Sequence, residues 1–188
     1  TYNQEMFGVA TRDIAKRLLY GLLYGCGALK AGTIIDPNEK NELILRELGS
    51  TAINSFMQGI PALKELKNRI AHNIAKREYL IGLDGRPLFC RSDFKGLNVL
   101  LQSSGALIMK QVVIELHNKM YDLGYIYGHD WQQNAMIHDE VQVSCPPAMV
   151  DTLTSVALEA FPASQQFFDF QCSIHGDAHV GYSWDQTH

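Results

Sequence analysis

The chain has 188 residues, a formal net charge of −4, and 46% hydrophobic residues. This length allows one ordinary domain or two small lobes with a real core. The sequence contains no run of 18 or more apolar residues, so we expect neither a membrane span nor a membrane partner. The four cysteines form no CxxC pair, which argues against a zinc knuckle and favours a reduced, cytoplasmic protein.

Charge is divided unevenly along the chain. Residues 1–100 contain 14 Lys and Arg against 10 Asp and Glu, whereas residues 101–188 contain 2 against 10. A basic half can bind phosphates and an acidic half can hold divalent metal ions. Two solvated faces of opposite sign would give the same counts.

The predicted elements are helical at first and mixed later. Apolar periodicity predicts a helix over 10–25 with Thr11 as N-cap, a second over 37–57 after Asp36-Pro37, and a third from Pro61 to Arg77. Further along, we expect a hairpin over 79–91, a long helix over 97–123, strands at 135–137 and 141–143, a helix over 147–161 and a strand over 167–174. The pattern predicts an α+β fold, with a helical lobe and an antiparallel-sheet lobe.

The first helix carries polar residues four positions apart: Arg12, Lys16, Tyr20 and Tyr24, followed by Gly25. Each step of four turns about 400°, so these side chains share one helix face. Two cations followed by two rings suit a nucleoside triphosphate, and Gly25 leaves room for a base. The alternative is a surface helix with ordinary basic residues and two half-buried tyrosines.

Acidic residues also lie between the two short strands of the 134–145 hairpin, in the triplet His138-Asp139-Glu140. Hard divalent metals prefer carboxylate oxygens, and a sheet would hold such a ligand rigidly. Adjacent residues of a strand point to opposite sides, so one strong ligand is expected. A polar hairpin tip is the alternative.

The long helix has a polar edge formed by Asn98 and Gln102. Amides donate and accept hydrogen bonds, so they can contact the minor-groove acceptors of base pairs. The alternative is a pair of amides that cap or satisfy the protein's own backbone.

The spacing Arg12-x-x-x-Lys16-x-x-x-Tyr20-Gly21-x-x-Tyr24-Gly25 resembles motif B of the family A DNA polymerases, the DNA polymerase I type. The segment 137–143, with its His-Asp-Glu triplet, resembles motif C of that family. Segments 82–86 and 97–106 resemble the stretches between the motifs, especially in the replicative polymerases of short-tailed phages. The resemblance implies a fingers lobe over 1–78 and part of a palm lobe over 79–188.

The resemblance implies template-directed DNA synthesis with two Mg²⁺ ions on primer–template DNA and deoxynucleoside triphosphates. Arg12 and Lys16 would bind the triphosphate, and Lys16 would also give a proton to the leaving pyrophosphate. Tyr20 would stack by the sugar, while Tyr24 and Gly25 would line the templating base. Asn98 and Gln102 would read the minor groove, Asp139 would ligate the metals, His138 would lie near the primer terminus, and Glu140 would support the metal ligand.

The resemblance also shows a departure, because the family's second metal-binding aspartate belongs to a motif A that this sequence lacks. Two-metal chemistry needs a clamp on both reacting oxygens, so we expect the chain to be inactive alone. Its partner would be an N-terminal polymerase fragment with motif A and the thumb, with or without an exonuclease domain, in a bacterial or phage-infected cell. Thr1 is compatible with a split-intein origin, a separate gene or a trimmed piece.

Two other interpretations stay open from the residues. A non-catalytic DNA-binding or scaffolding remnant of a polymerase would bind DNA without selecting nucleotides. A metal hydrolase built on Asp139, Glu140 and histidines would leave the array from Arg12 to Gly25 unexplained.

Overall fold

The structure, a computed structural model, describes residues 2–187. Thr1, on which the split-intein hypothesis depends, lies outside the described residues. The chain forms two compact units, one up to Gln102 and the other from Ser103 onward. Each unit combines helices with a two-stranded antiparallel sheet. The fold is therefore α+β, as the sequence predicts.

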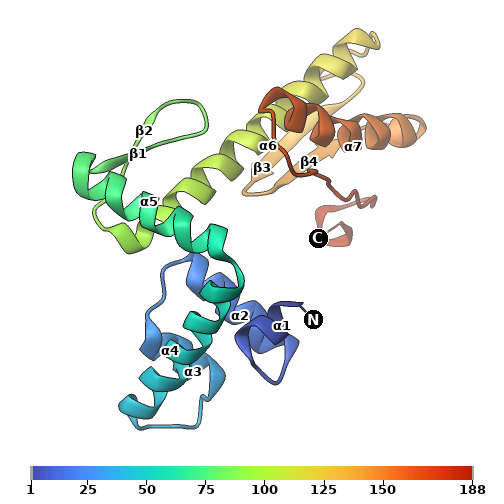
Figure 1. The fold of residues 1–188 in the computed structure, drawn as a ribbon. Helices are drawn as coiled ribbons and strands as arrows, with labels where there is room; N and C mark the ends of the chain where they lie inside the picture. Colours follow the sequence, from blue (N-terminus) through green and yellow to red (C-terminus); the bar gives the residue numbers. More distant parts are fainter. Residues whose placement is uncertain (1, 188) are drawn as a thin grey trace. The chain divides into compact units, whose positions relative to one another are not determined.

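The first unit is mainly helical (Figure 1). Its elements are α1 (Tyr2–Phe7), α2 (Arg12–Leu23), α3 (Ala28–Ile35), α4 (Glu42–Gly59), α5 (Pro61–Arg77), β1 (Tyr79–Ile81), β2 (Pro87–Phe89), the 3-10 helix η1 (Asp93–Lys95) and the first turns of α6 (Gly96–Asp122). Helices α1 to α4 enclose one core, in which the rings of Phe7 and Phe56 stack with centroids 4.1 Å apart. A second core joins Ile70, Leu80 and Leu97 from α5, β1 and α6.

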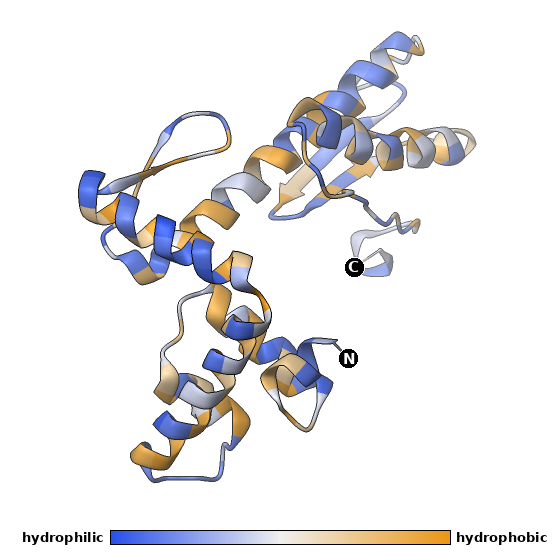
Figure 2. Cartoon of the chain, in the orientation of Figure 1, coloured by the Kyte–Doolittle hydropathy of each residue, from blue (hydrophilic) through white to orange (hydrophobic). Residues whose placement is uncertain are grey.

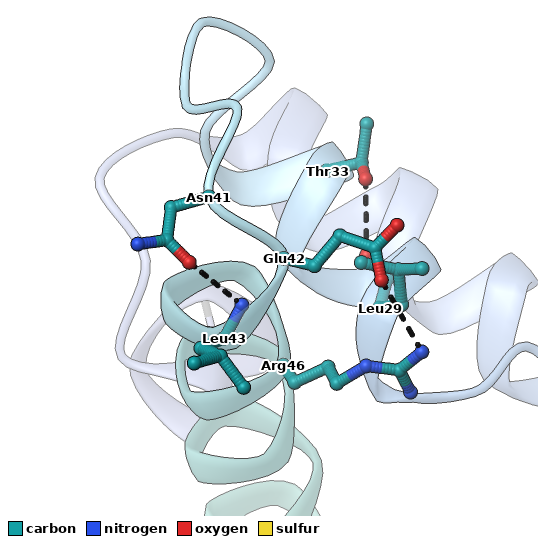
Figure 3. Close-up of polar contacts among 6 residues, drawn as sticks. All are labelled: Leu29, Thr33, Asn41, Glu42, Leu43 and Arg46. Atoms are coloured by element: carbon teal, nitrogen blue, oxygen red, sulfur yellow. Dashed lines mark hydrogen bonds and ion pairs between the residues drawn. The ribbon is translucent and has the colours of Figure 1, made fainter.

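Helix α4 begins later than the Asp36-Pro37 pattern predicts, and α3 was not predicted at all. Figure 3 shows the cap of α4, where the Asn41 side-chain oxygen accepts a hydrogen bond from the Leu43 N–H at 3.0 Å. Asp36 instead accepts bonds from the backbone N–H groups two and three residues later, which fixes a turn. The prediction of a helix from residue 37 is therefore wrong.

The second unit contains the rest of α6, β3 (Gln132–Ile137), β4 (Glu140–Ser144), the 3-10 helix η2 (Pro147–Met149), α7 (Val150–Phe167) and η3 (Trp184–Gln186). Its core packs Val112, Leu116 and Met120 of α6 with residues of α7. Helix α7 runs through Pro162 to Phe167, and no strand follows among the described residues. The predicted strand over 167–174 is therefore wrong.

Helix α6 is long and contains an apolar stretch. By length and composition alone the stretch Asp93–Asp122 could cross a membrane, and 22% of its most apolar window is buried. A core helix of a water-soluble protein passes the same test, and Leu97, Val112 and Met120 do belong to cores. Figure 2 shows hydrophobic and hydrophilic residues interspersed along α6, whereas most of α5 is hydrophilic. The expected absence of a membrane span stays a prediction.

The four cysteines are free thiols in different surroundings. Cys90 is buried, Cys26 and Cys145 are half-buried, and Cys172 is exposed. Burial raises the pKa of the Cys26, Cys90 and Cys145 thiols above the ordinary value.

Candidate functional site

The predicted motif B residues lie on helix α2, whose start is fixed by Thr11. Its hydroxyl oxygen accepts a hydrogen bond from the Ile14 N–H at 3.3 Å, as an N-cap does. Ala15, Leu18 and Leu22 face the core and are nearly inaccessible to solvent. The burial of this apolar stripe leaves the opposite side of α2 exposed to solvent.

Arg12, Lys16 and Tyr20 lie on that exposed side. In the described part of the chain, neither cation forms an ion pair with a carboxylate. The positive charge of both groups is therefore available to an anionic ligand. A phosphate chain lying along the helix could contact both cations, because they are one helical turn apart.

Helix α2 ends in a turn that requires glycine. Gly25 has φ +80°, the Cys26 N–H bonds to the Gly21 carbonyl at 2.8 Å, and the Gly25 N–H bonds to the Leu22 carbonyl at 3.1 Å. A Cβ on Gly25 would come closer than 3.0 Å to the carbonyl oxygen of Phe94. Helix α2 therefore ends directly against η1, the segment that leads into α6.

The end of α2 is also tied to α6 by side chains. The Gln102 amide donates a hydrogen bond to the Tyr24 hydroxyl at 3.0 Å, across 78 positions of sequence. Both side chains are exposed, whereas Asn98 is partly buried. A hydrogen bond therefore links Tyr24, from the predicted motif B, with Gln102, from the predicted polar edge of the long helix.

The predicted motif C residues lie at the tip of the β3–β4 hairpin. Ile137 pairs with Glu140, so His138 and Asp139 form a two-residue turn. His138 has φ +55°, a region that non-glycine residues adopt at a cost of about 1–2 kcal/mol. Both turn residues are exposed, and Asp139 therefore projects its carboxylate from a short, strained turn.

Glu140 differs from Asp139 because neighbouring side chains engage it. Its Oε1 accepts hydrogen bonds from the Gln142 amide and, at 3.2 Å, from the indole N–H of Trp184. A groove of about 830 Å³ lies in this unit. Its lining includes Asp139, Glu140, apolar residues of α6 and α7, and C-terminal residues around Trp184.

Asp139 is the candidate metal ligand, and it lies outside any larger cluster of possible ligands among residues 2–187. Residues 2–187 contain no group of three His, Cys, Asp or Glu side chains that could hold a metal ion. Asp139 fits one position in a Mg²⁺ site, because this ion commonly takes one or two protein carboxylates together with substrate phosphates and water.

Sequence reasoning missed two residues at these sites. The backbone of Phe94 meets Gly25, and Trp184 donates to Glu140. An apolar residue at position 94, between the charged residues Asp93 and Lys95, weakly indicates that the Phe94 side chain packs against the protein. The residues next to Trp184 in the sequence give no indication that its indole bonds to Glu140.

Comparison with solved structures shows a similar fold. The fold matches that of the structure described as the POL domain of Pol1 from M. smegmatis in complex with DNA primer-template and dNTP, with a TM-score of 0.69 and 18% identity. The match covers 86% of this chain and 30% of that chain. The similarity is therefore one of fold, over part of that chain.

The family follows from the sequence. The pattern of DNA polymerase family A matches residues 2–186, and the chain belongs to this family. Over its whole length the chain is 32% identical to the DNA-directed DNA polymerase of Enterobacteria phage T3 and 31% identical to that of Escherichia phage T7. It spans 28% of the length of each of these relatives.

Proposed function

We propose that the chain supplies the nucleotide-binding helix and one metal-binding carboxylate of a family A DNA polymerase that is completed by an N-terminal portion. The observation that carries this proposal is the exposed array of Arg12, Lys16 and Tyr20, free of carboxylate partners in the described chain, within a family match to residues 2–186. The reaction is the attack of a primer 3′-hydroxyl on the α-phosphate of a deoxynucleoside triphosphate, with release of pyrophosphate.

In this proposal the α2 face binds the incoming nucleotide. Arg12 and Lys16 neutralise the triphosphate, and Lys16 can give a proton to the leaving pyrophosphate. Tyr20 packs beside the sugar. These roles use groups fixed on a helix, so they require little reorganisation when charge develops during the reaction.

The DNA contacts follow from the end of α2 and the start of α6. Tyr24 and Gly25 line the place of the templating base, where the Tyr24 ring is exposed. Gln102 and Asn98 contact minor-groove acceptors of the primer–template duplex. Their amide groups can donate to acceptors that all base pairs share, which suits an enzyme that copies any sequence.

The hairpin tip supplies the metal-binding group. Asp139 would hold Mg²⁺, which when bound supplies charge stabilisation to the reacting oxygens. His138 lies beside it for contact with the primer terminus, and Glu140 supports the turn. The second aspartate, the thumb and any exonuclease come from the N-terminal portion, in the cytoplasm of a bacterial or phage-infected cell.

Primer extension tests this proposal. The chain would be assayed with a primer–template, deoxynucleoside triphosphates and Mg²⁺, alone and together with a separately made N-terminal portion from a phage relative that contains motif A. We expect extension only with both portions, and a loss of at least about a hundredfold with Asp139→Asn. Asp151→Asn, an exposed aspartate on α7, is the matched control and should retain activity.

Each other outcome has a definite meaning. Extension by the chain alone would show that its own carboxylates complete the metal site. DNA binding by both portions without extension would favour the non-catalytic scaffold. Equal loss in the Asp139 and Asp151 variants would contradict a specific role for the hairpin tip.

A further inference from the structure

The chain after α7 is anchored to the second unit although it has little regular structure. We call residues 168–187 the C-terminal segment. Near its start, the Gln165 side chain donates to the Phe170 carbonyl at 3.2 Å and accepts from the Ile174 N–H at 3.1 Å. Gly176 then packs so closely on the Phe161 ring that a Cβ there would come within 3.0 Å. The segment (dark red in Figure 1) is therefore held at successive points rather than only at its start.

The end of the C-terminal segment forms a compact turn around η3. The Tyr182 N–H bonds to the Gln186 side chain at 2.8 Å, the Ser183 hydroxyl bonds to Asp185, and the Thr187 hydroxyl bonds to the Trp184 carbonyl at 3.0 Å. These bonds are all local to the turn, joining residues no more than four positions apart. Trp184 therefore lies within a hydrogen-bonded turn.

The indole of Trp184 reaches the residue next to Asp139. The Trp184 N–H donates to Glu140 Oε1 at 3.2 Å, across 44 positions of sequence. The same oxygen accepts from Gln142, two residues along β4. A carboxylate that accepts two donors has a restricted orientation, and bonds to charged groups are stronger than neutral ones.

The backbone conformation of the hairpin turn is one that requires stabilising contacts from the surrounding structure. His138 has a positive φ, and strained turns persist only where the surroundings hold them. Glu140 is the residue at which the turn re-enters β4, where it pairs with Ile137. Restricting the Glu140 side chain therefore restricts the backbone on one side of Asp139.

We propose that Trp184 is a positioning residue of the polymerase site, which holds Glu140 through its indole N–H and thereby orients the turn that carries Asp139. The C-terminal segment is then a structural part of the motif C site. This inference rests on the proposed function, because Asp139 matters only if the hairpin tip takes part in nucleotidyl transfer.

The contact itself is tested on the 188-residue chain without any activity. The protein has two tryptophans, and their indole N–H resonances are separate probes in a ¹⁵N-labelled sample. Glu140→Ala should shift the Trp184 resonance and leave that of the buried Trp131 in place. Asp151→Ala, a carboxylate elsewhere in this unit, should shift neither. An unmoved Trp184 resonance in the Glu140 variant would overturn the inference.

The positioning role is tested in the reconstituted enzyme. Trp184→Phe keeps an aromatic ring and removes the N–H, and Trp184 is 51% exposed, so the variant should fold. We expect kcat to fall about three- to tenfold with an unchanged KM for the nucleotide. Combined with Glu140→Ala, which removes the acceptor, it should add no further loss. Tyr182→Phe, at a ring that is 97% exposed, is the matched control and should leave kcat unchanged.

An unchanged kcat in Trp184→Phe, or losses that multiply in the double variant, would overturn the positioning role. If the unsubstituted pair of portions fails to extend primers while the Trp184 resonance still responds to Glu140→Ala, the proposed function and the role built on it both fail, and only the contact stands. The two measurements thus separate an error about the contact from an error about the reaction.

Discussion

Replacing Gly25 with alanine should destabilise the first compact unit through two separable effects. Gly25 has φ +80°, and a non-glycine residue in that region costs about 1–2 kcal/mol. The added Cβ would also lie closer than 3.0 Å to the Phe94 carbonyl oxygen, where ordinary contact begins at 3.4 Å. Forcing an atom into a packed site costs about 1–3 kcal/mol. The unfolding free energy should therefore fall by about 2–5 kcal/mol.

Gly85→Ala provides the matched control, because Gly85 has φ +81° and a Cβ added there would meet nothing within 4 Å. It should show the backbone cost of about 1–2 kcal/mol alone. Hydrogen exchange of the α2 amides in increasing urea measures the stability of this unit in both variants. Equal losses for Gly25→Ala and Gly85→Ala would refute the argument from the close approach of Phe94.

Three further predictions concern stability and titration. Phe56→Ala should lower the unfolding free energy by about 3–5 kcal/mol, whereas Leu43→Ala, at a 77% exposed position, should change it by less than about 0.5 kcal/mol in urea unfolding. Hydrogen bonds from the Ile126 backbone N–H and the His129 side chain lower the pKa of Asp130 from its ordinary value of 3.8. The ionised carboxylate therefore stabilises the fold above pH 3.8, and this contribution is lost as the pH falls through the lowered pKa. NMR titration should give a midpoint below 3.8 and Asp130→Asn should remove this pH dependence, whereas a midpoint at or above 3.8 would contradict the bonds. Tyr24→Phe should shift the Gln102 side-chain amide resonances and cost less than about 1 kcal/mol, because the bond is exposed; unmoved resonances would argue against it.

Local rules predicted the elements whose ends are fixed by nearby residues. Proline at the first position and basic residues in the last turn placed the helix from Pro61 to Arg77, and Glu78 ends it in a left-handed conformation. The Asp36-Pro37 pattern failed because the same carboxylate geometry that caps a helix also fixes a turn. The candidate residues on α2 and at Asp139 were proposed from spacing, and their roles stay predictions.

The contacts that shape the sites were beyond sequence reasoning. Tyr24 bonds to Gln102 across 78 positions, and Trp184 bonds to Glu140 across 44. Neither partner is marked by its neighbours, because such pairs depend on how whole elements pack. The positive φ of His138 was equally hidden, since a histidine does not signal that conformation as glycine would.

Differences in exposure among the four thiols would allow a thiol reagent to label the C-terminal segment selectively at Cys172. Thiolates react with maleimides and thiols do not, so the raised pKa values of Cys26, Cys90 and Cys145 slow their labelling. Cys172 is exposed and lies between the anchor at Gln165 and the turn around Trp184. A single fluorophore attached there without any mutation would report whether this stretch of chain changes its mobility when DNA or the proposed N-terminal portion is added.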